Sequence, residues 1–362
     1  MRNRLRAVRD KQSGIEEAHQ MDSSVNVASA SAESAPPAEA DFWDVTSVVR
    51  ELANIRRNWR DINAPHAEYG VESFPSRVRL AKVTDELSGA LFPLRLGPDF
   101  VRRHNEDTFV TQSLQIALSR LHAQLRLELT YANHEHDRAT VDAMATRIVA
   151  AFSSELPNIR RLLDLDIEAA FRGDPSARSL DEVLICYPGL LAIIHHRLAH
   201  ALHDLGAPLV ARIVAEISHE RTGIDIHPGA HIGRGFFIDH GTGVVIGETA
   251  IIGDNVRLYQ GVTLGARNFP ADPSGALIKS LPRHPVIEDN VVIFAGATIL
   301  GRVTIGAGSE IGGNVWLTHD VAPLSRVFQA REQNLVIRPG GEFSGRNPGT
   351  EDQDIEGLNA KV

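Results

Sequence analysis

The sequence predicts an α+β protein in which an all-α N-terminal region is followed by a parallel β-helix. Thirteen branched aliphatic residues in the C-terminal half recur almost entirely every six residues. Neither an α-helix, with a period of about 3.6 residues, nor an alternating strand spaces apolar residues in this way. A six-residue repeat is typical of a three-sided parallel β-helix, in which each repeat forms one short strand and one corner. The thirteen residues are Ile226, Ile232, Ile238, Ile246, Ile252, Leu258, Leu264, Ile287, Ile293, Ile299, Ile305, Ile311 and Leu317.

Glycine is concentrated in the same part of the chain. Of the 29 glycines, 17 lie between Gly223 and Gly313. Corners of a coil require backbone conformations with positive φ, which glycine adopts at little cost. Each inward aliphatic side chain should then stack on its counterpart in the next coil, about 4.8 Å away.

The region from Phe42 to about Arg221 has helical periodicity. Gly173 predicts a helix end, and Asp174 with Pro175 predicts the N-cap and first residue of the next helix. Three apolar stripes carry the helical pattern, the last of them ending near Gly206: Leu114, Leu118, Leu121 and Leu125; Leu163, Ile167 and Phe171; and Leu190, Leu191, Ile194, Leu198 and Leu202.

These patterns divide the chain into four parts. Residues 1–41 are expected to be a disordered extension, because the stretch from Ser23 to Ala40 is rich in Ala, Ser, Pro and Glu. Residues 42–221 form the helical domain, and residues 222–323 form the β-helix, from which residues 266–284 project as a loop. Residues 324–362 form a Gly-rich, acidic tail.

Composition excludes several classes of protein. The net charge of −9, without a basic stripe, argues against nucleic acid as a partner. No apolar run approaches the roughly 18 residues of a membrane helix, and no apolar segment follows the basic N-terminus as in a secretory signal. The single cysteine, Cys186, excludes an internal disulfide and is expected to be a small buried apolar residue. We therefore expect a cytoplasmic protein that does not contact membranes.

Titratable residues gather where the six-residue repeat breaks. A full coil takes about eighteen residues, so Asp225 and His240 should lie near the same edge of the prism in adjoining coils. A carboxylate that orients a neutral imidazole makes a suitable general base near neutral pH. The second break ends in Arg283 and His284, and the guanidinium fork suits a substrate carboxylate.

These residues belong to motifs that resemble the serine O-acetyltransferase family. The resemblance extends from about Ile159 to Gln329, and the order and spacing of several motifs agree together. The motifs are RGDP at Arg172, DIHP at Asp225, IGRG at Ile232, DHGTG at Asp239, VIGET at Val245, QGVTLG at Gln260, RHP at Arg283 and AGATILG at Ala295.

The resemblance implies a left-handed β-helix and direct acetyl transfer from acetyl-CoA to the hydroxyl of L-serine, as part of cysteine biosynthesis. His240 would take the hydroxyl proton, and Asp225 would orient His240. No acyl-enzyme is required, because both reactants bind together. The substrate-binding residues implied are Asp174 and Asp239 for the amino group, with Arg283 and His284 for the carboxylate. The residues implied for the CoA groove are Gly265, Ala295 and Gly313.

The resemblance also implies partners. Three prisms should pack side by side, because the active site of the family lies between neighbouring subunits, and the helical domains could pair two trimers into a hexamer. L-cysteine is expected as a feedback inhibitor that uses the serine-binding groups. Arg267 and Lys279, in the projecting loop, are candidate contacts to CoA phosphates. Family members that dock into O-acetylserine sulfhydrylase end in isoleucine, whereas this sequence ends in Val362, so that complex is not assumed, although a smaller terminal apolar group leaves it open.

Simpler roles remain open for several of these residues. Asp174 could act only as a helix cap and Asp225 only as a turn residue, while His227 and His231 are more simply surface or subunit-contact residues. The helical spacing of His196, His200 and His203 suits a metal, but no accompanying carboxylate or cysteine ligands follow, so we expect none.

Three further classes of protein share the β-helix. A γ-type carbonic anhydrase would leave Arg283 unexplained. The repeat would also suit an acetyltransferase for another small acceptor, or a catalytically silent assembly subunit. Acetyl transfer to L-serine remains the function that the motifs favour.

Overall fold

A computed structural model of the chain describes residues 45–63, 74–132, 136–268, 270–273, 275–278 and 281–329. The first helix belongs to one compact unit, and all later elements belong to a second. The expected extension at residues 1–41, Lys279 and the tail beyond residue 329 lie outside the described residues.

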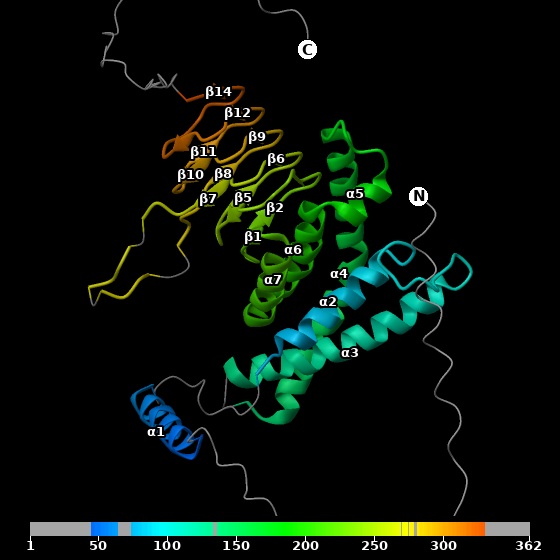
Figure 1. Ribbon diagram of the computed structural model, residues 1–362, viewed down its shortest axis with the longest axis vertical. Helices are drawn as coiled ribbons and strands as arrows, with labels where there is room; N and C mark the ends of the chain where they lie inside the picture. Colours follow the sequence, from blue (N-terminus) through cyan, green and yellow to red (C-terminus); the bar gives the residue numbers. More distant parts are fainter. Residues whose placement is uncertain are drawn as a thin grey trace, which may run out of the picture. The chain divides into compact units, whose positions relative to one another are not determined.

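Helices occupy the N-terminal half of the described chain (Figure 1). Helix α4 ends at Gly173, and α6 ends just before Gly206, as the sequence predicts. The predicted stripes face the core through Leu121, Leu125 and Leu163, which are fully buried, whereas Phe171, near the end of α4, is exposed. The helices are α1 (Val45–Asn63), α2 (Arg77–Leu91), α3 (Glu106–Ala132), α4 (Arg138–Gly173), α5 (Leu180–Cys186), α6 (Pro188–Asp204) and α7 (Pro208–Thr222).

Short parallel strands follow in three sheets, which form the three sides of a prism (Figure 1). The first sheet contains β1 (Asp225–Ile226), β4 (Val245–Ile246), β7 (Thr263–Gly265), β10 (Thr298–Leu300) and β13 (Trp316–Leu317). The second contains β2 (His231–Ile232), β5 (Ile251–Ile252), β8 (Val286–Ile287) and β11 (Thr304–Ile305). The third contains β3 (Phe237–Ile238), β6 (Arg257–Leu258), β9 (Val292–Ile293), β12 (Glu310–Ile311) and β14 (Arg326–Val327).

The register confirms the predicted β-helix, because all thirteen repeat residues pair with one another along the prism axis. In the first sheet, Ile226 pairs with Ile246, and Leu264 continues the column. The other two sheets repeat this pattern through their own aliphatic columns. Twelve of the thirteen side chains are at least 96% buried, and the remaining one, Ile232, is half-buried against the core. The six-residue repeat in the sequence therefore corresponds to the aliphatic side chains that fill the prism interior.

A buried ion pair joins the helical layer to the first coils of the prism. The carboxylate of Asp166 on α4 accepts hydrogen bonds from Arg197 on α6 at 2.6 Å and from the backbone N–H of Phe236 at 2.9 Å. Arg197 also donates to the carbonyl of Gly233 at 2.8 Å. Breaking such a pair leaves an uncompensated buried charge, which costs about 3–5 kcal/mol. Helices and prism consequently share one core.

Two local predictions are wrong. Asp174 is the C-cap of α4 rather than an N-cap, and α5 begins only at Leu180, capped by Ser179. The Asp174 carboxylate instead accepts hydrogen bonds from the N–H and hydroxyl of Ser176, which closes a turn around Pro175. Cys186 is exposed rather than buried, because the last residue of α5 faces away from the core.

The α5–α6 segment is the most apolar helical stretch by sequence. Among the described helices, no single one is both long and apolar enough to cross a membrane. Helices α5 and α6 meet that test only when taken together, and a bend of 74° separates them.

Candidate active site

The first group of predicted site residues lies at the corner between β3 and β4. His240 has a φ of +59°, a left-handed conformation that is uncommon for a residue with a side chain. Its side chain is 71% exposed, and its Nδ1 lies 3.8 Å from Asp239. Asp239 is buried and accepts a hydrogen bond at 2.7 Å from Arg257 on β6. The corner therefore presents an exposed imidazole beside a fixed carboxylate.

Asp174 joins this group from the end of α4. Tyr187 donates its hydroxyl proton to Asp174 Oδ2 at 2.5 Å, while Ser176 donates to Oδ1. These hydrogen bonds, the one from Tyr187 foremost, lower the pKa of Asp174, and the positive charge of Arg257 acts in the same direction. Burial and the bond to Asp174 raise the pKa of Tyr187 to about 12. Asp174 is therefore held as a carboxylate, which suits an ammonium group.

A hollow of about 470 Å³ runs along the prism from His240. Two of the residues expected in the CoA groove, Ala295 and Gly313, line it. Its wall includes Tyr259 and Phe294, whose rings stack with centroids 5.2 Å apart. An elongated, largely apolar groove that ends at an imidazole can accommodate a thioester arm with its reactive end at the base. The third expected residue, Gly265, lies on β7 against Leu300 and does not line this hollow.

The second group lies at a different edge of the prism, between β7 and β8. Arg283 donates to Glu248 at 2.5 Å. His284 is buried, and its Nδ1 accepts from the N–H of Thr249 at 3.0 Å. The Thr249 hydroxyl oxygen in turn accepts from the N–H groups of Arg283 and His284. Arg283 and His284 are thus locked to the preceding coil by Glu248 and Thr249.

Burial shifts the pKa of two histidines near the second group. Burial, and then the charge of Arg283, lower the pKa of His284 to about 4. Burial, and then the charge of Arg212, lower the pKa of His227 to about 4 as well. Both rings are therefore neutral at physiological pH and act as fixed polar groups rather than as bases.

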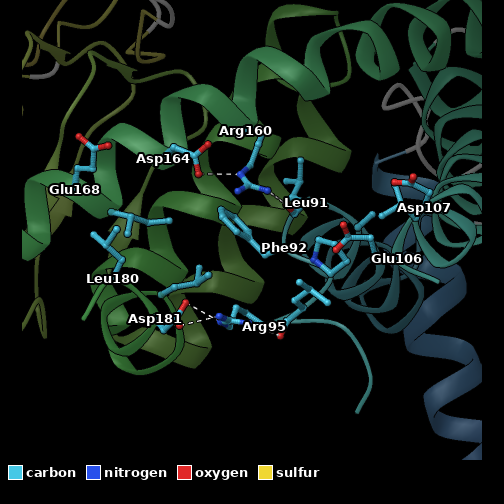
Figure 2. A pocket seen from close by; sticks show the side chains of 16 residues that line it. Leu91, Phe92, Arg95, Glu106, Asp107, Arg160, Asp164, Glu168, Leu180 and Asp181 are labelled. Carbon is cyan, nitrogen blue, oxygen red and sulfur yellow. Dashed lines mark hydrogen bonds and ion pairs between the residues drawn. The ribbon is translucent and has the colours of Figure 1, made fainter. Parts of the chain in front are cut away.

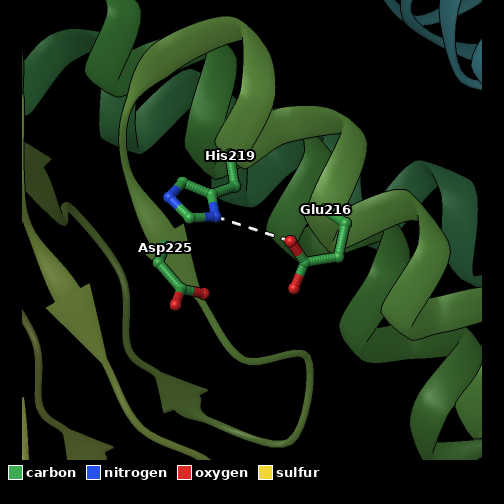
Figure 3. A group of neighbouring side chains, drawn as sticks. All are labelled: Glu216, His219 and Asp225. Atoms are coloured by element: carbon green, nitrogen blue, oxygen red, sulfur yellow. Dashed lines mark ion pairs between the residues drawn. The ribbon is translucent and has the colours of Figure 1, made fainter.

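Asp225 lies on the prism side that joins these two edges. Its neighbours are Glu216 and His219 of α7 (Figure 3), and one ligand atom of each residue lies within 4.8 Å of the others. Among the described residues, these form the one group of three side chains whose spacing could hold a metal ion. Glu216 is already paired with Arg212 at 2.6 Å. The expectation that Asp225 orients His240, and that no metal is required, stays a prediction.

One chain therefore brings some of the predicted residues together and separates others. Asp174, Asp239 and His240 share an edge with the hollow, whereas Arg283 and His284 occupy the next edge. Arg267, on the projecting loop, packs against Gly301.

Sequence reasoning missed residues that fix the site. Tyr187 and Arg257 hold the carboxylates of the first group, and Glu248 and Thr249 hold the second. Glu248 and Thr249 belong to the VIGET motif, so the motif could have identified them as site residues from the sequence. Arg257 occupies an outward position of an ordinary repeat, and nothing in its spacing distinguishes it.

A larger hollow, of about 680 Å³, lies in the helical part of the chain (Figure 2). Its cations are already paired: Arg95 binds Asp181 at 2.7 Å, and Arg160 binds Asp164 at 2.9 Å. None of the predicted site residues lines it. We therefore place the candidate active site at the prism edges, where the exposed imidazole of His240 borders a groove and Arg283 and His284 are fixed at the next edge.

Comparisons with known proteins identify the family of the chain. Residues 284–319 match the model of the bacterial transferase hexapeptide family (six repeats). A plasmid serine acetyltransferase of Synechococcus elongatus is 49% identical over 306 residues, which cover 83% of this chain and 95% of that protein. The serine acetyltransferase of Bacillus subtilis is 49% identical over 167 residues, 46% of this chain and 73% of that protein.

Solved structures give the same result. Serine acetyltransferase isoform 3 of Entamoeba histolytica, in complex with cysteine, aligns with a TM-score of 0.61 at 37% identity, over 71% of this chain and 84% of that one. Serine acetyltransferase 1 of the same organism, in complex with L-cysteine, gives 0.60 at 37% identity, over 68% and 86%. Fold and site thus define a hexapeptide-repeat acyltransferase with a left-handed β-helix. More specifically, the chain belongs to the serine acetyltransferase family.

Proposed function

We propose that this protein transfers the acetyl group of acetyl-CoA to the hydroxyl of L-serine, with His240 as the general base. The main support for this proposal is the position of His240, whose exposed imidazole lines the hollow with Ala295 and Gly313. The product, O-acetyl-L-serine, is a cysteine precursor. A cytoplasmic location suits this reaction.

The chemistry follows from that position. The serine hydroxyl is a weak nucleophile until a base accepts its proton. As His240 takes the proton, the oxygen attacks the thioester carbonyl carbon, and collapse of the tetrahedral intermediate breaks the C–S bond. The CoA thiolate then leaves and recovers the proton from the imidazolium. Holding both reactants beside one imidazole supplies much of the rate enhancement.

Charges at the two edges match the two ends of serine. Asp174 and Asp239 are fixed carboxylates beside His240, and they suit the serine ammonium group. Arg283 suits the serine carboxylate, and His284 can add a hydrogen bond. When the ammonium and carboxylate groups of serine are both bound, the hydroxyl is the group that is left to contact His240.

The two edges belong to one site if a neighbouring copy supplies the second. Asp174, Asp239 and His240 would come from one protomer, and Arg283 and His284 from the next. Such a head-to-tail contact closes into a ring, and a three-sided prism suits a homotrimer. Asp225, on the side between the edges, would then face the interface where it can orient the imidazole.

The assignment is tested by thiol release from acetyl-CoA, with and without L-serine. We expect release that requires L-serine and that His240→Ala abolishes. Homoserine, threonine and sugars serve as control acceptors. Preference for one of these acceptors over L-serine, or serine-independent release, would overturn the proposal.

Mixing two inactive variants tests whether the site is shared. His240→Ala and Arg283→Ala should each be inactive alone, but co-expressed chains form mixed trimers. About a quarter of the interfaces would then combine an intact His240 edge with an intact Arg283 edge, so about a quarter of the wild-type rate should return. If each chain builds its own site, no activity returns.

L-cysteine should compete with L-serine, because it carries the same ammonium and carboxylate groups. The Entamoeba histolytica relatives were crystallised with cysteine, which supports this expectation. An Arg283→Lys variant, which keeps a charge but loses the fork, should lose affinity for both ligands in parallel. Unchanged inhibition alongside weakened serine binding would contradict a shared subsite.

A further inference from the structure

Helix α1 carries an apolar stripe that is open to solvent. Among its side chains, seven large apolar residues are between 46% and 77% exposed, although they share one face. Scattered exposed apolar residues are ordinary, but a continuous stripe marks an interaction surface. The seven residues are Val45, Val48, Val49, Leu52, Ile55, Trp59 and Ile62.

The spacing of the stripe is that of a coiled coil. Six of the seven residues alternate in steps of three and four, which places Val45, Leu52 and Trp59 at one heptad position (a) and Val48, Ile55 and Ile62 at the other (d). A sustained a and d pattern with a seven-residue repeat packs helices knobs-into-holes around each other. An amphipathic helix that covers a globular core usually has a wider apolar face.

The flanking charges indicate what the partner is. Glu51 occupies position g of one heptad, and Arg56 occupies position e of the next. In a parallel coiled coil, position g of one helix faces position e of the following heptad on its neighbour, so Glu51 would meet Arg56 of another copy. Because both charges come from the same sequence, two copies of α1 in parallel complement each other.

The central heptad also favours a particular number of helices. Leu at position a followed by Ile at position d shifts the preference from dimers towards trimers and tetramers. Leu52 and Ile55 form this pair.

The helix also needs a partner for its stability. Most helical stability in proteins comes from packing of the apolar face rather than from the helix propensity of the local sequence. Helix α1 has no acidic residue in its first turn to offset the helix dipole. Burial of the a and d side chains against a partner helix would stabilise α1 through the hydrophobic effect.

From the heptad register and the charge pattern we infer that α1 forms a parallel three-helix coiled coil with α1 of two other copies of this chain. This assembly is independent of the proposed reaction, since none of its residues belongs to the candidate site. It would tie the N-termini of three protomers together and lower the concentration at which the oligomer dissociates.

Cysteine cross-linking of the full-length chain tests this inference. In a Cys186→Ser background, Ile55→Cys at position d should form a disulfide between copies under mild oxidation, because identical d positions face each other only in a parallel, in-register bundle. The matched control is Arg57→Cys at the outward position f, which should remain uncross-linked. Denaturing gels should show covalent dimers for the first variant only.

A second variant tests the energetic role. Leu52→Asp with Ile55→Asp should raise the concentration at which the oligomer dissociates by at least ten-fold, measured by sedimentation, while the β-helix keeps its circular dichroism spectrum and acetyl transfer at high protein concentration. Equal cross-linking of the variants at positions 55 and 57, or unchanged dissociation, would overturn the inference. In that case the stripe does not pack against α1 of another copy.

Discussion

The two prism edges that carry the candidate site are built in opposite ways. At the β3–β4 corner, the side chain of His240 is 71% exposed and lines a hollow. The hydrogen bonds from Arg257 and Tyr187 fix the neighbouring carboxylates of Asp239 and Asp174. At the β7–β8 corner, His284 is buried, and Thr249 fixes its ring nitrogen. The same residue type is therefore an exposed group at one edge and a buried, hydrogen-bonded group at the other.

This difference separates chemistry from recognition. A base must exchange a proton with substrate, so it needs access and a ring that can be charged. A recognition group gains from rigidity, because a donor that is already fixed loses little entropy on binding. The exposed edge thus suits proton transfer, and the buried edge suits orientation of the substrate.

The sharpest way to break this comparison is to remove each histidine in turn. His240→Ala should reduce kcat about 10²- to 10⁴-fold, the usual contribution of a general base, with little change in the melting temperature. His284→Ala should lower the melting temperature as well as activity, because it removes a buried ring. Thermal unfolding and steady-state kinetics measure both. Equal loss of stability in the two variants would contradict the division of roles.

A glycine beneath the second edge provides the next test. A Cβ added at Gly247 would lie 2.0 Å from Cδ2 of His284. Gly247→Ala should therefore destabilise the protein by about 1–3 kcal/mol, the usual cost of overpacking. Gly89→Ala, in helix α2, meets no atom closer than 3.4 Å and serves as the control. In that helix the change should be neutral or slightly stabilising. Denaturant titration gives both values.

The protonation of the buried edge predicts how stability depends on pH. His284 and His227 have pKa values of about 4 when folded, whereas an unfolded histidine has a pKa of about 6.5. Between these values the unfolded chain binds more protons, so stability should be highest above pH 6.5 and should fall as the pH drops towards 4. Urea titrations at fixed protein concentration measure the slope. His284→Asn should flatten it, and an unchanged slope would exclude His284 as a contributor.

The smallest expected effect concerns the partner of Arg283. Glu248→Ala removes the carboxylate that holds the guanidinium at 2.5 Å. One such hydrogen bond is worth about 1 kcal/mol, so KM for L-serine should rise roughly five-fold with a smaller change in kcat. Glu248→Gln, which keeps an acceptor oxygen, should recover part of the loss. A change in kcat alone would place Glu248 in the chemical step instead.

Local errors in the sequence-based prediction have a physical cause. Asp174 before Pro175 has the composition of an N-cap, yet its carboxylate bonds to Ser176 and Tyr187 instead. Asp, Ser and Pro favour caps and turns alike, so only the packing of α5 and α6 decides between them. The prediction for Cys186 was wrong because seven residues carry too little periodicity to show which face of the helix is buried, and the structure buries Val183 and Leu184 instead.

The sequence by itself determined the β-helix, because an inward column of aliphatic residues every six positions is a local periodic signal that no other regular structure satisfies. It also determined which polar residues interrupt that period, and hence His240, Asp239, Arg283 and His284. Only the tertiary structure decided that these residues occupy different edges, that Tyr187 and Arg257 fix the carboxylates, and that Asp225 lies beside α7. The reason is physical: such contacts join residues from separate elements, and their distances depend on how those elements pack rather than on their spacing in the chain.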